Sequence, residues 1–479
     1  MPVEAHRTTP SRTPRAPNPA PAPKSGWREL FRTAPFTNAA VVLAIVIGFF
    51  HGWLKLKIRH PVATFLFDLP LLAALAMAFS RLPSAAAWFP PGRASQAMKC
   101  FYGVIAVWFA LSMVLPHGAP FLVALAAVRG WVFATLMFGL GYHIVGSHRQ
   151  LHGYFLLIIL LSAITSLYAT RQTLEEVEAM RALDPYFELM TRGQGYVDED
   201  GRHVLRRFST FISSGAFGGT MAVSLLFLSA LLTDRSVGRL EKLLLVGLAL
   251  VIGWGMALSG ARSAVLALGL GLLVIAWHRR LSLGMLWLGG AFTAGLLLAV
   301  QATEGGVLHR LATLDLDAIW GRFYVVWAPG LRYLLESGLL GGGLGKAGVG
   351  YPMSLAHYLG PFEVWGVDGD LGKTMAEMGI VGVGVVAWLL IAGLLDGTRI
   401  LLRRRLDRVG TLALGAVCAF LIAAITFPIG SPFIGIPLGV LTWFFLGAVI
   451  RLDQLEPTGN PHAAPSAPSP PPPKRFLYR

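Results

Sequence analysis

Long apolar runs separated by short polar stretches dominate the chain from about residue 37 to residue 450. Most runs approach the length of about 20 residues that a helix needs to cross the hydrocarbon core of a bilayer, with about 17 as the lower end. The pattern therefore predicts an all-α integral membrane protein with about twelve transmembrane helices. The predicted spans lie near 37–54, 62–80, 100–116, 127–146, 152–169, 215–232, 243–260, 264–277, 283–301, 374–395, 409–427 and 433–450.

Two polar stretches, about 170–214 and 302–373, are too long to be simple turns between neighbouring spans. In the first, apolar residues recur with a helical period over 174–183, which predicts a helix that lies on the membrane surface or packs as an ordinary helix on the second loop. We expect the second loop to be partly helical. The basic residues 1–36 and the Pro-rich residues 453–479 have the composition of disordered tails.

Composition supports one polytopic membrane domain over 37–452. The 479 residues are 55% hydrophobic and 14% charged, whereas a soluble chain carries about 25% charged residues. The net charge of +15 is typical of cytoplasmic loops held against anionic lipid. The basic residues are not interleaved with aromatic residues, which argues against nucleic acid as a partner. Both cysteines, Cys100 and Cys418, lie in or beside apolar runs, which argues against a disulfide or a metal site.

The distribution of arginine and lysine predicts the orientation. If the N-terminus is cytoplasmic, every predicted inner segment carries basic residues, and the C-terminal tail also falls inside. These inner segments are 81–99, 147–151, 233–242, 278–281 and 396–408. The same topology puts both long loops outside. The first outer loop, with Lys55, Lys57 and Arg59, does not fit the rule.

The predicted outer segments are rich in arginine, against the usual bias. These residues are Arg206, Arg207, Arg262, Arg322 and Arg332. Guanidinium groups bind phosphate oxygens bidentately and stay charged at any relevant pH, so the arginines are candidate ligands of a lipid-linked phosphate. The alternative is that each one extends its side chain to the outer lipid headgroups.

Three residues of the second loop are candidate general bases. Asp368 and Asp370 come just before the span at 374–395, where a carboxylate could accept the proton of an attacking hydroxyl. Asp370 could instead cap the following helix. His357 has a side chain whose pKa suits acid–base work, although a single loop histidine is often only a polar surface residue.

Two further features need a structural explanation. The glycine run Gly341–Gly345 is not a nucleotide-binding loop, since Lys346 is followed by alanine and no strand pattern precedes the run. Its glycines are expected to allow a tight turn or the close approach of backbone to a ligand. Asp68 and Arg129 lie in or near predicted spans, where charges are costly, and could pair with each other.

Several segments together resemble the bacterial O-antigen ligase and polysaccharide polymerase superfamily over about 120–450. They are RRFSTFISSGAFGG at 206–219, ALSGARSA at 257–264, GRFYVVW at 321–327, SGLLGGGLG at 337–345 and VDGDLGKTMAEMGIVG at 367–382. The resemblance implies a metal-independent inverting glycosyltransferase with no cofactor, which moves a glycan from undecaprenyl pyrophosphate at the periplasmic side of the inner membrane. The pyrophosphate-binding arginines of the family correspond to Arg207, Arg262 and Arg322.

The chain departs from the ligase pattern at one point. Ligases carry a His-Asn pair in the last of these segments, and this chain has Asp368-Gly369, which is close to the Asp-Asn of many exopolysaccharide polymerases. The resemblance therefore favours a polymerase of lipid-linked repeat units, with an O-antigen ligase as the alternative. It implies a lipid-linked glycan donor, a glycan acceptor, membrane lipid and, optionally, a chain-length regulator or other export proteins as partners.

Two other classes of protein remain as alternatives. A transporter of the same lipid-linked glycan would need charged residues and broken, inversely repeated helices along a path through the bilayer. The charges of this chain are concentrated in the two outer loops, which favours chemistry at one face. The Pro-rich tails could bind partner proteins, and their composition is also that of simple disordered ends.

Overall fold

A computed structural model describes most of the chain between Phe31 and Glu456. The described residues are 31, 34–58, 63, 65–114, 119–183, 187–188, 191–197, 201, 203–234, 236–279, 289–290, 293–294, 297, 301, 320–321, 323–347, 365–404, 407–431, 433 and 435–456. Most of the two predicted tails lies outside these residues, but residues 35–36 and 453–455 are helical, so each predicted tail begins or ends too close to the bundle. The predictions for Arg322 and His357 and for most of the predicted span at 283–301 lie outside the described residues.

Ten described helices are long and apolar enough to cross a membrane, and each overlaps one predicted span. They are α2 (Pro35–Ile58), α4 (Arg93–Val114), α5 (Phe121–Ile144), α6 (His148–Ala169), α9 (Ser214–Thr233), α10 (Arg239–Leu258), α11 (Arg262–Arg279), α17 (Asp370–Arg403), α18 (Arg408–Thr426) and α19 (Leu438–Leu455). The prediction of a helical membrane protein is therefore confirmed. Among the described residues of the predicted span at 62–80, the long helix is α3 (Asp68–Phe79), whose 12 residues reach about 18 Å.

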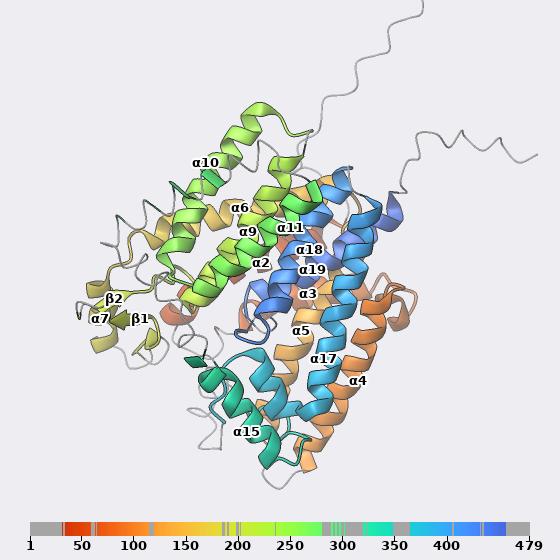
Figure 1. The fold of residues 1–479 in the computed structure, drawn as a ribbon. Helices are drawn as coiled ribbons and strands as arrows, with labels where there is room; N and C mark the ends of the chain where they lie inside the picture. Colours follow the sequence, from red (N-terminus) through yellow and green to blue (C-terminus); the bar gives the residue numbers. More distant parts are fainter. Residues whose placement is uncertain are drawn as a thin grey trace, which may run out of the picture.

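Small residues let the central helices approach each other closely. In Figure 1, α5, α18 and α19 lie in the middle of the bundle. A Cβ atom added at Gly141 of α5 would collide with the carbonyl of Phe444, and one at Gly447 of α19 would collide with the carbonyl of Phe138. Helices in a bilayer gain no hydrophobic free energy by associating, so such close van der Waals contact is a main source of their stability.

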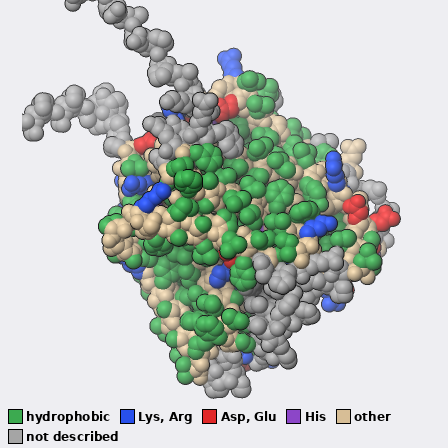
Figure 2. All heavy atoms as spheres, turned by 180° about the vertical axis from the view of Figure 1, so that it is seen from behind, with side chains coloured by type: hydrophobic (Ala, Val, Ile, Leu, Met, Phe, Trp, Pro, Cys, Tyr) green, Lys and Arg blue, Asp and Glu red, His purple; other side chains and the backbone are tan. Residues whose placement is uncertain are grey.

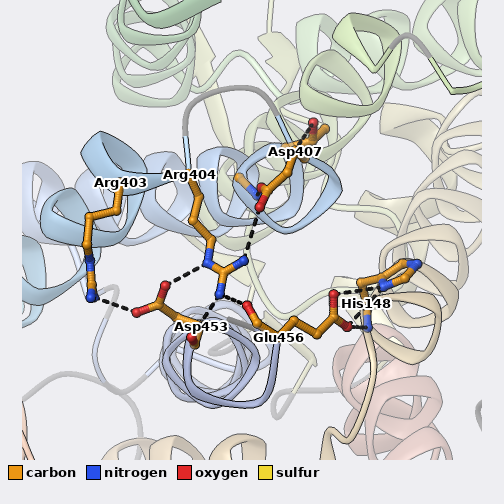
Figure 3. Close-up of polar contacts among 8 residues, drawn as sticks. His148, Arg403, Arg404, Asp407, Asp453 and Glu456 are labelled. Carbon is orange, nitrogen blue, oxygen red and sulfur yellow. Dashed lines mark hydrogen bonds and ion pairs between the residues drawn. The ribbon is translucent and has the colours of Figure 1, made fainter. Parts of the chain in front are cut away.

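A network of ion pairs joins the helix ends at one end of the bundle (Figure 3). The buried side chain of Arg404, which follows α17, donates from Nε to Oδ1 of Asp453 at 2.6 Å and from Nη1 to Oδ2 of Asp407 at 3.0 Å. His148, the first residue of α6, lies 3.0 Å from Glu456. We call this end, where α2 begins and α19 ends, the tail end. The opposite end is called the loop end.

The start of α2 is also fixed at the tail end. The amide oxygen of Asn38 accepts hydrogen bonds from the Gln150 side chain at 2.9 Å and from the Tyr154 hydroxyl at 2.6 Å. Both donors belong to the first two turns of α6. The helices α2 and α6 therefore begin side by side, and their other ends reach the loop end together.

The described parts of the two long loops contain short elements. The first loop contains α7 (Leu174–Leu183), which is the helix predicted at 174–183, and the antiparallel strands β1 (Gly195–Val197) and β2 (His203–Leu205). The second loop contains a π-helical turn, η3 (Phe323–Trp327), followed by α15 (Ala328–Glu336). A further short helix, η2 (Ala85–Trp88), precedes α4. Figure 1 shows α7 with the strands at one side of the molecule and α15 standing apart from them, beside α17.

The outer surface matches a hydrocarbon environment. Hydrophobic side chains cover most of the described surface in Figure 2, and the Lys, Arg, Asp and Glu side chains lie mainly towards its margins. Large apolar side chains such as Trp277 of α11 and Leu240 of α10 are more than two-thirds exposed. Exposed apolar surface on this scale is expected where lipid tails take the place of water.

The contact between α5 and α19 generates a stability prediction. The substitution Gly447→Val places a branched side chain against the carbonyl of Phe138 and should lower the stability of the protein by about 1–3 kcal/mol or more. The matched control is Gly247→Val in α10, where a Cβ atom meets nothing within 4 Å. Thermal unfolding of both variants in detergent measures the effect. Equal melting temperatures for the two variants would contradict the close packing of α5 on α19.

Candidate functional site

The segment 206–213 crosses the loop end of the bundle and bonds to carbonyls of two helices, α6 and α2. The Ser209 hydroxyl donates to the carbonyl of Thr165 in α6 at 2.6 Å, and the Thr210 hydroxyl donates to the carbonyl of Phe49 in α2 at 2.6 Å. Both hydroxyl side chains are buried. These bonds hold in place the backbone of the two arginines that open the segment.

Arg207 lies against the loop end of α6. Its Nη1 donates to the carbonyl oxygens of Ala169 at 3.1 Å and Thr170 at 2.9 Å. A cation is favoured there by the partial negative charge of a helix C-terminus. Partial burial lowers the pKa of the Arg207 guanidinium, but arginine stays protonated at any relevant pH. Both bonds come from Nη1, and no described residue accepts a hydrogen bond from Nη2.

Arg262 is brought to the same place by the turn between α10 and α11. The backbone N–H of Arg207 donates to the carbonyl of Leu258, the last residue of α10, at 3.2 Å. Arg262 begins α11 four residues later, and a Cβ atom at Gly218 of α9 would lie 2.7 Å from that of Ala261 in the turn. Two arginines that are 55 positions apart in the sequence therefore sit on directly contacting backbone segments.

Two other predicted arginines have different surroundings. The backbone of Arg206 bonds to the carbonyl of Gln194 at 3.1 Å, which joins it to the residues before the β1 strand. Arg332 is exposed on α15, and its Nε lies 2.7 Å from Glu336. The hydrogen bond from Arg332 to Glu336 raises the pKa of the arginine. The described contacts of Arg332 therefore do not join it to Arg207 or Arg262.

Asp370 is buried and holds a loop against the start of α17. Its backbone N–H donates to the carbonyl of Gly430 at 2.7 Å, and its Oδ2 accepts a hydrogen bond from the backbone N–H of Phe433 at 2.6 Å. The side chain makes no capping bond to its own helix, whose N-cap residue is Gly369. The capping hypothesis is therefore replaced by a tertiary contact, in which the carboxylate ties α17 to the segment that precedes α19.

Asp368 has a different position from Asp370, although only one residue separates them. It is exposed, and its Oδ1 accepts a hydrogen bond from the N–H of Gly369 at 2.9 Å. Gly369 has a φ of +77°, which an L residue rarely adopts. This conformation turns the chain so that one acid is buried and the other lies at the surface. Asp368 is therefore the accessible carboxylate of the two.

The glycine run packs against a break in α17. Gly379 has a φ of 64° and interrupts the helix. The N–H groups of Gly342 and Gly343 donate to the carbonyls of the turn before this break, and the N–H of Ile380 donates to the carbonyl of Leu339 at 3.0 Å. A side chain at Gly341 or Gly379 would collide with the opposite backbone. The glycines therefore allow a close approach of backbone, and the partner of this approach is α17, whereas we expected a tight turn or a ligand.

A buried carboxylate that sequence reasoning missed supports this break. Glu377 is fully buried. Its Oε2 accepts from Nε1 of Trp131 in α5 at 2.8 Å, and its Oε1 accepts from the N–H of Gly345 at 3.0 Å. The Nζ of Lys373, one turn earlier, lies 3.8 Å away. The spacing of Lys373 and Glu377 at the start of a predicted span is the signal that could have identified the pair.

Asp68 and Arg129 form an ion pair, as the sequence analysis suggested they could. Nε of Arg129 donates to Oδ2 of Asp68 at 2.7 Å, and Nη2 donates to Oδ1. This two-point geometry joins α3 to α5 and satisfies both oxygens of a nearly buried carboxylate.

The residues between α18 and α19 contact Asp370 and also the helices α2 and α9, which flank the arginine segment. Gly430 and Phe433 contact Asp370, as described above. Four residues later, Pro437 lies 3.1 Å from the position of a Cβ atom at Gly48 of α2. Leu438 lies 3.3 Å from the position of a Cβ atom at Gly219 of α9, the helix that begins just after the arginine segment. The structure thus brings both groups to the loop end, joined through one intervening segment. Comparison with protein-family models and with curated proteins found no match for the chain.

The buried carboxylate generates a stability prediction. The substitution Glu377→Leu leaves the N–H groups of Trp131 and Gly345 buried without acceptors, which should cost about 2–5 kcal/mol. The control is Glu336→Leu, which removes only an exposed ion pair and should cost less than about 1 kcal/mol. Melting temperatures in detergent compare the two. If Glu377→Leu melts no lower than the control, Glu377 does not hold the glycine run.

Proposed function

We propose that the protein is a polysaccharide polymerase that joins undecaprenyl-pyrophosphate-linked repeat units at the periplasmic face of the bacterial inner membrane. The observation that carries the proposal is the hydrogen bond from the backbone of Arg207 to Leu258. It makes neighbours of two guanidinium-bearing segments at one end of a membrane bundle. The sequence resemblance assigns pyrophosphate binding to the same two segments, Arg207 and Arg262.

The arginines would hold the leaving group. As the bond between the sugar and the pyrophosphate breaks, negative charge grows on the leaving oxygen, and preorganised guanidinium groups stabilise that charge. Arg207 is suited to this role because the carbonyls of α6 hold one of its terminal nitrogens in place. Arg262 and, from the resemblance, Arg322 would complete the set, with Arg206 beside them. Arg332 would act only if α15 moves towards the others.

Asp368 is the proposed general base. The acceptor hydroxyl would attack the anomeric carbon of the donor sugar from the side opposite the pyrophosphate and invert that centre. The hydroxyl proton would pass to the Asp368 carboxylate, and undecaprenyl pyrophosphate would leave with the bonding electron pair. Asp368 is preferred over Asp370 because it is exposed, whereas Asp370 is buried against the N–H of Phe433. His357 remains the alternative base.

Polymerase is preferred over ligase because of one position. The chain has an aspartate, Asp368, where the ligases that it resembles have a histidine. If His357 is instead the base, the ligase becomes the stronger reading. In both reactions the donor and the leaving group are the same, and only the acceptor differs.

The arginine assignment predicts the behaviour of single variants in cells. Arg262→Ala and Arg207→Ala should each abolish polymer in a strain that lacks the wild-type gene, while protein in the membrane stays at the wild-type level. The control is Arg239→Ala at the opposite end of α10, which should support normal polymer. The readout is the size profile of extracted glycan.

The same strain without any complementing gene separates the alternatives. Single repeat units on lipid at the outer face indicate a lost polymerase. Full-length polymer that never reaches the lipid A core indicates a lost ligase, and repeat units trapped on the inner face indicate a lost transporter. Normal polymer from Arg262→Ala would refute the arginine assignment in every case.

The base assignment predicts a contrast between two neighbouring acids. Asp368→Asn should abolish polymer and leave the melting temperature unchanged, since its side chain is exposed. Asp370→Asn should lower the melting temperature, because it weakens the bond to the N–H of Phe433. The activity per folded molecule should fall less in Asp370→Asn than in Asp368→Asn. If His357→Ala abolishes polymer and Asp368→Asn does not, the histidine is the base.

A further inference from the structure

Lys55 is a buried lysine near the loop end of α2. Its exposed fraction is 6%, although Lys57, two residues further along the same helix, is exposed. Lysine side chains at the ends of membrane helices usually extend towards water or headgroups, as Lys57 does. The burial of Lys55 therefore needs a separate reason.

No described residue neutralises Lys55. The guanidinium of Arg129 lies close enough to repel it. Both carboxylate oxygens of Asp68 are engaged by Arg129. Among the described residues, Lys55 has no hydrogen bond or ion pair. Three helices, α2, α3 and α5, thus contribute two positive charges and one negative charge to a mostly buried place.

An uncompensated cation at this position is costly. Burial of an unpaired charge is strongly unfavourable, and ionisable residues in membrane segments usually mark a binding site or pathway. A ligand that carries negative charge would remove this cost. The net charge of +1 left by Lys55, Arg129 and Asp68 specifies an anion, and a lysine ammonium binds phosphate as a point charge.

The position of Lys55 indicates where the anion comes from. Leu56 packs with Phe208, which follows Arg207 directly. The N–H of Trp53 donates to the carbonyl of Thr210 at 2.9 Å. Lys55 therefore lies on the turn of α2 around which the arginine segment folds, at the end of a predicted span. The headgroup region of a bilayer begins where the membrane spans end.

We propose that Lys55 is the ligand of a lipid phosphate group, in a site completed by Arg129 and oriented by the pairing of Arg129 with Asp68. The site also explains why the predicted first outer loop departs from the usual charge bias, because one of its three cations is a binding residue. The phosphate belongs either to a polyprenyl pyrophosphate or to a phospholipid headgroup. The inference does not require glycosyl transfer, so it can fail or succeed independently of the proposed function.

A binding measurement on the full-length protein in detergent tests the site. Native mass spectrometry would measure the binding of undecaprenyl pyrophosphate, phosphatidylglycerol and inorganic pyrophosphate. Lys55→Met should weaken the binding of one of the two lipids by about tenfold or more, the worth of a charge-assisted hydrogen bond. Lys55→Arg should retain binding. The matched control Lys57→Met should change binding by less than about threefold, as expected for an exposed charge.

The outcomes separate the sources of the phosphate. Loss confined to undecaprenyl pyrophosphate identifies the polyprenyl lipid, and loss confined to phosphatidylglycerol identifies a phospholipid headgroup. Equal binding by Lys55→Met and wild type for both lipids overturns the site, and so do equal losses in Lys55→Met and Lys57→Met. If Lys55→Met does not fold, Lys55→Gln provides the test, because it removes the charge and keeps a polar side chain of similar length. It should weaken lipid binding to a similar extent, and unchanged binding would overturn the proposal.

Discussion

Backbone polar groups at membrane depth must find partners inside the protein, since lipid offers none. The loop end of this chain depends on that constraint. Where α17 breaks at Gly379, the glycine run supplies the missing partners, and the Glu377 carboxylate binds the run in turn. The segment 206–213 meets the same need by bonding to carbonyls of α6 and α2. Irregular backbone is therefore held rigidly at this end, where a site requires accurately placed groups.

The charged residues held by this backbone fall into two groups, which differ in burial. Asp370 and Glu377 are buried and bound to N–H groups, so their carboxylates hold segments together. Arg207 and Asp368 carry their charge at the half-buried or exposed edge of the same framework. In the proposed mechanism, Arg207 binds the lipid pyrophosphate and Asp368 accepts the proton of the acceptor hydroxyl. The buried acids Asp370 and Glu377 hold the backbone around them in place. The site is thus composite, with residues from the α6–α9 loop, the α10–α11 turn and the start of α17.

The pattern of apolar residues was sufficient to predict the ten described membrane helices, because a helix that crosses a bilayer needs about 20 predominantly apolar residues. It also predicted α7. At 62–80 the agreement is only partial, because the described helix there, α3, begins at Asp68 and has 12 residues. The adjacency of Arg207 and Arg262 came from resemblance and could not be read from spacing, since it depends on a turn packing against a loop. The roles of Asp370, Glu377 and Lys55 depend on burial, which a single sequence does not reveal.

The most direct measurement is reconstitution with the substrate. Purified protein in lipid vesicles would receive the lipid-linked repeat units that accumulate in the deletion strain, and free undecaprenyl pyrophosphate and glycan length would be followed together. The account predicts one undecaprenyl pyrophosphate released for each new glycosidic bond, with inversion at the anomeric carbon and without added metal. Longer glycan without that release, or transfer of the lipid-linked unit across the vesicle membrane without any new bond, would contradict it.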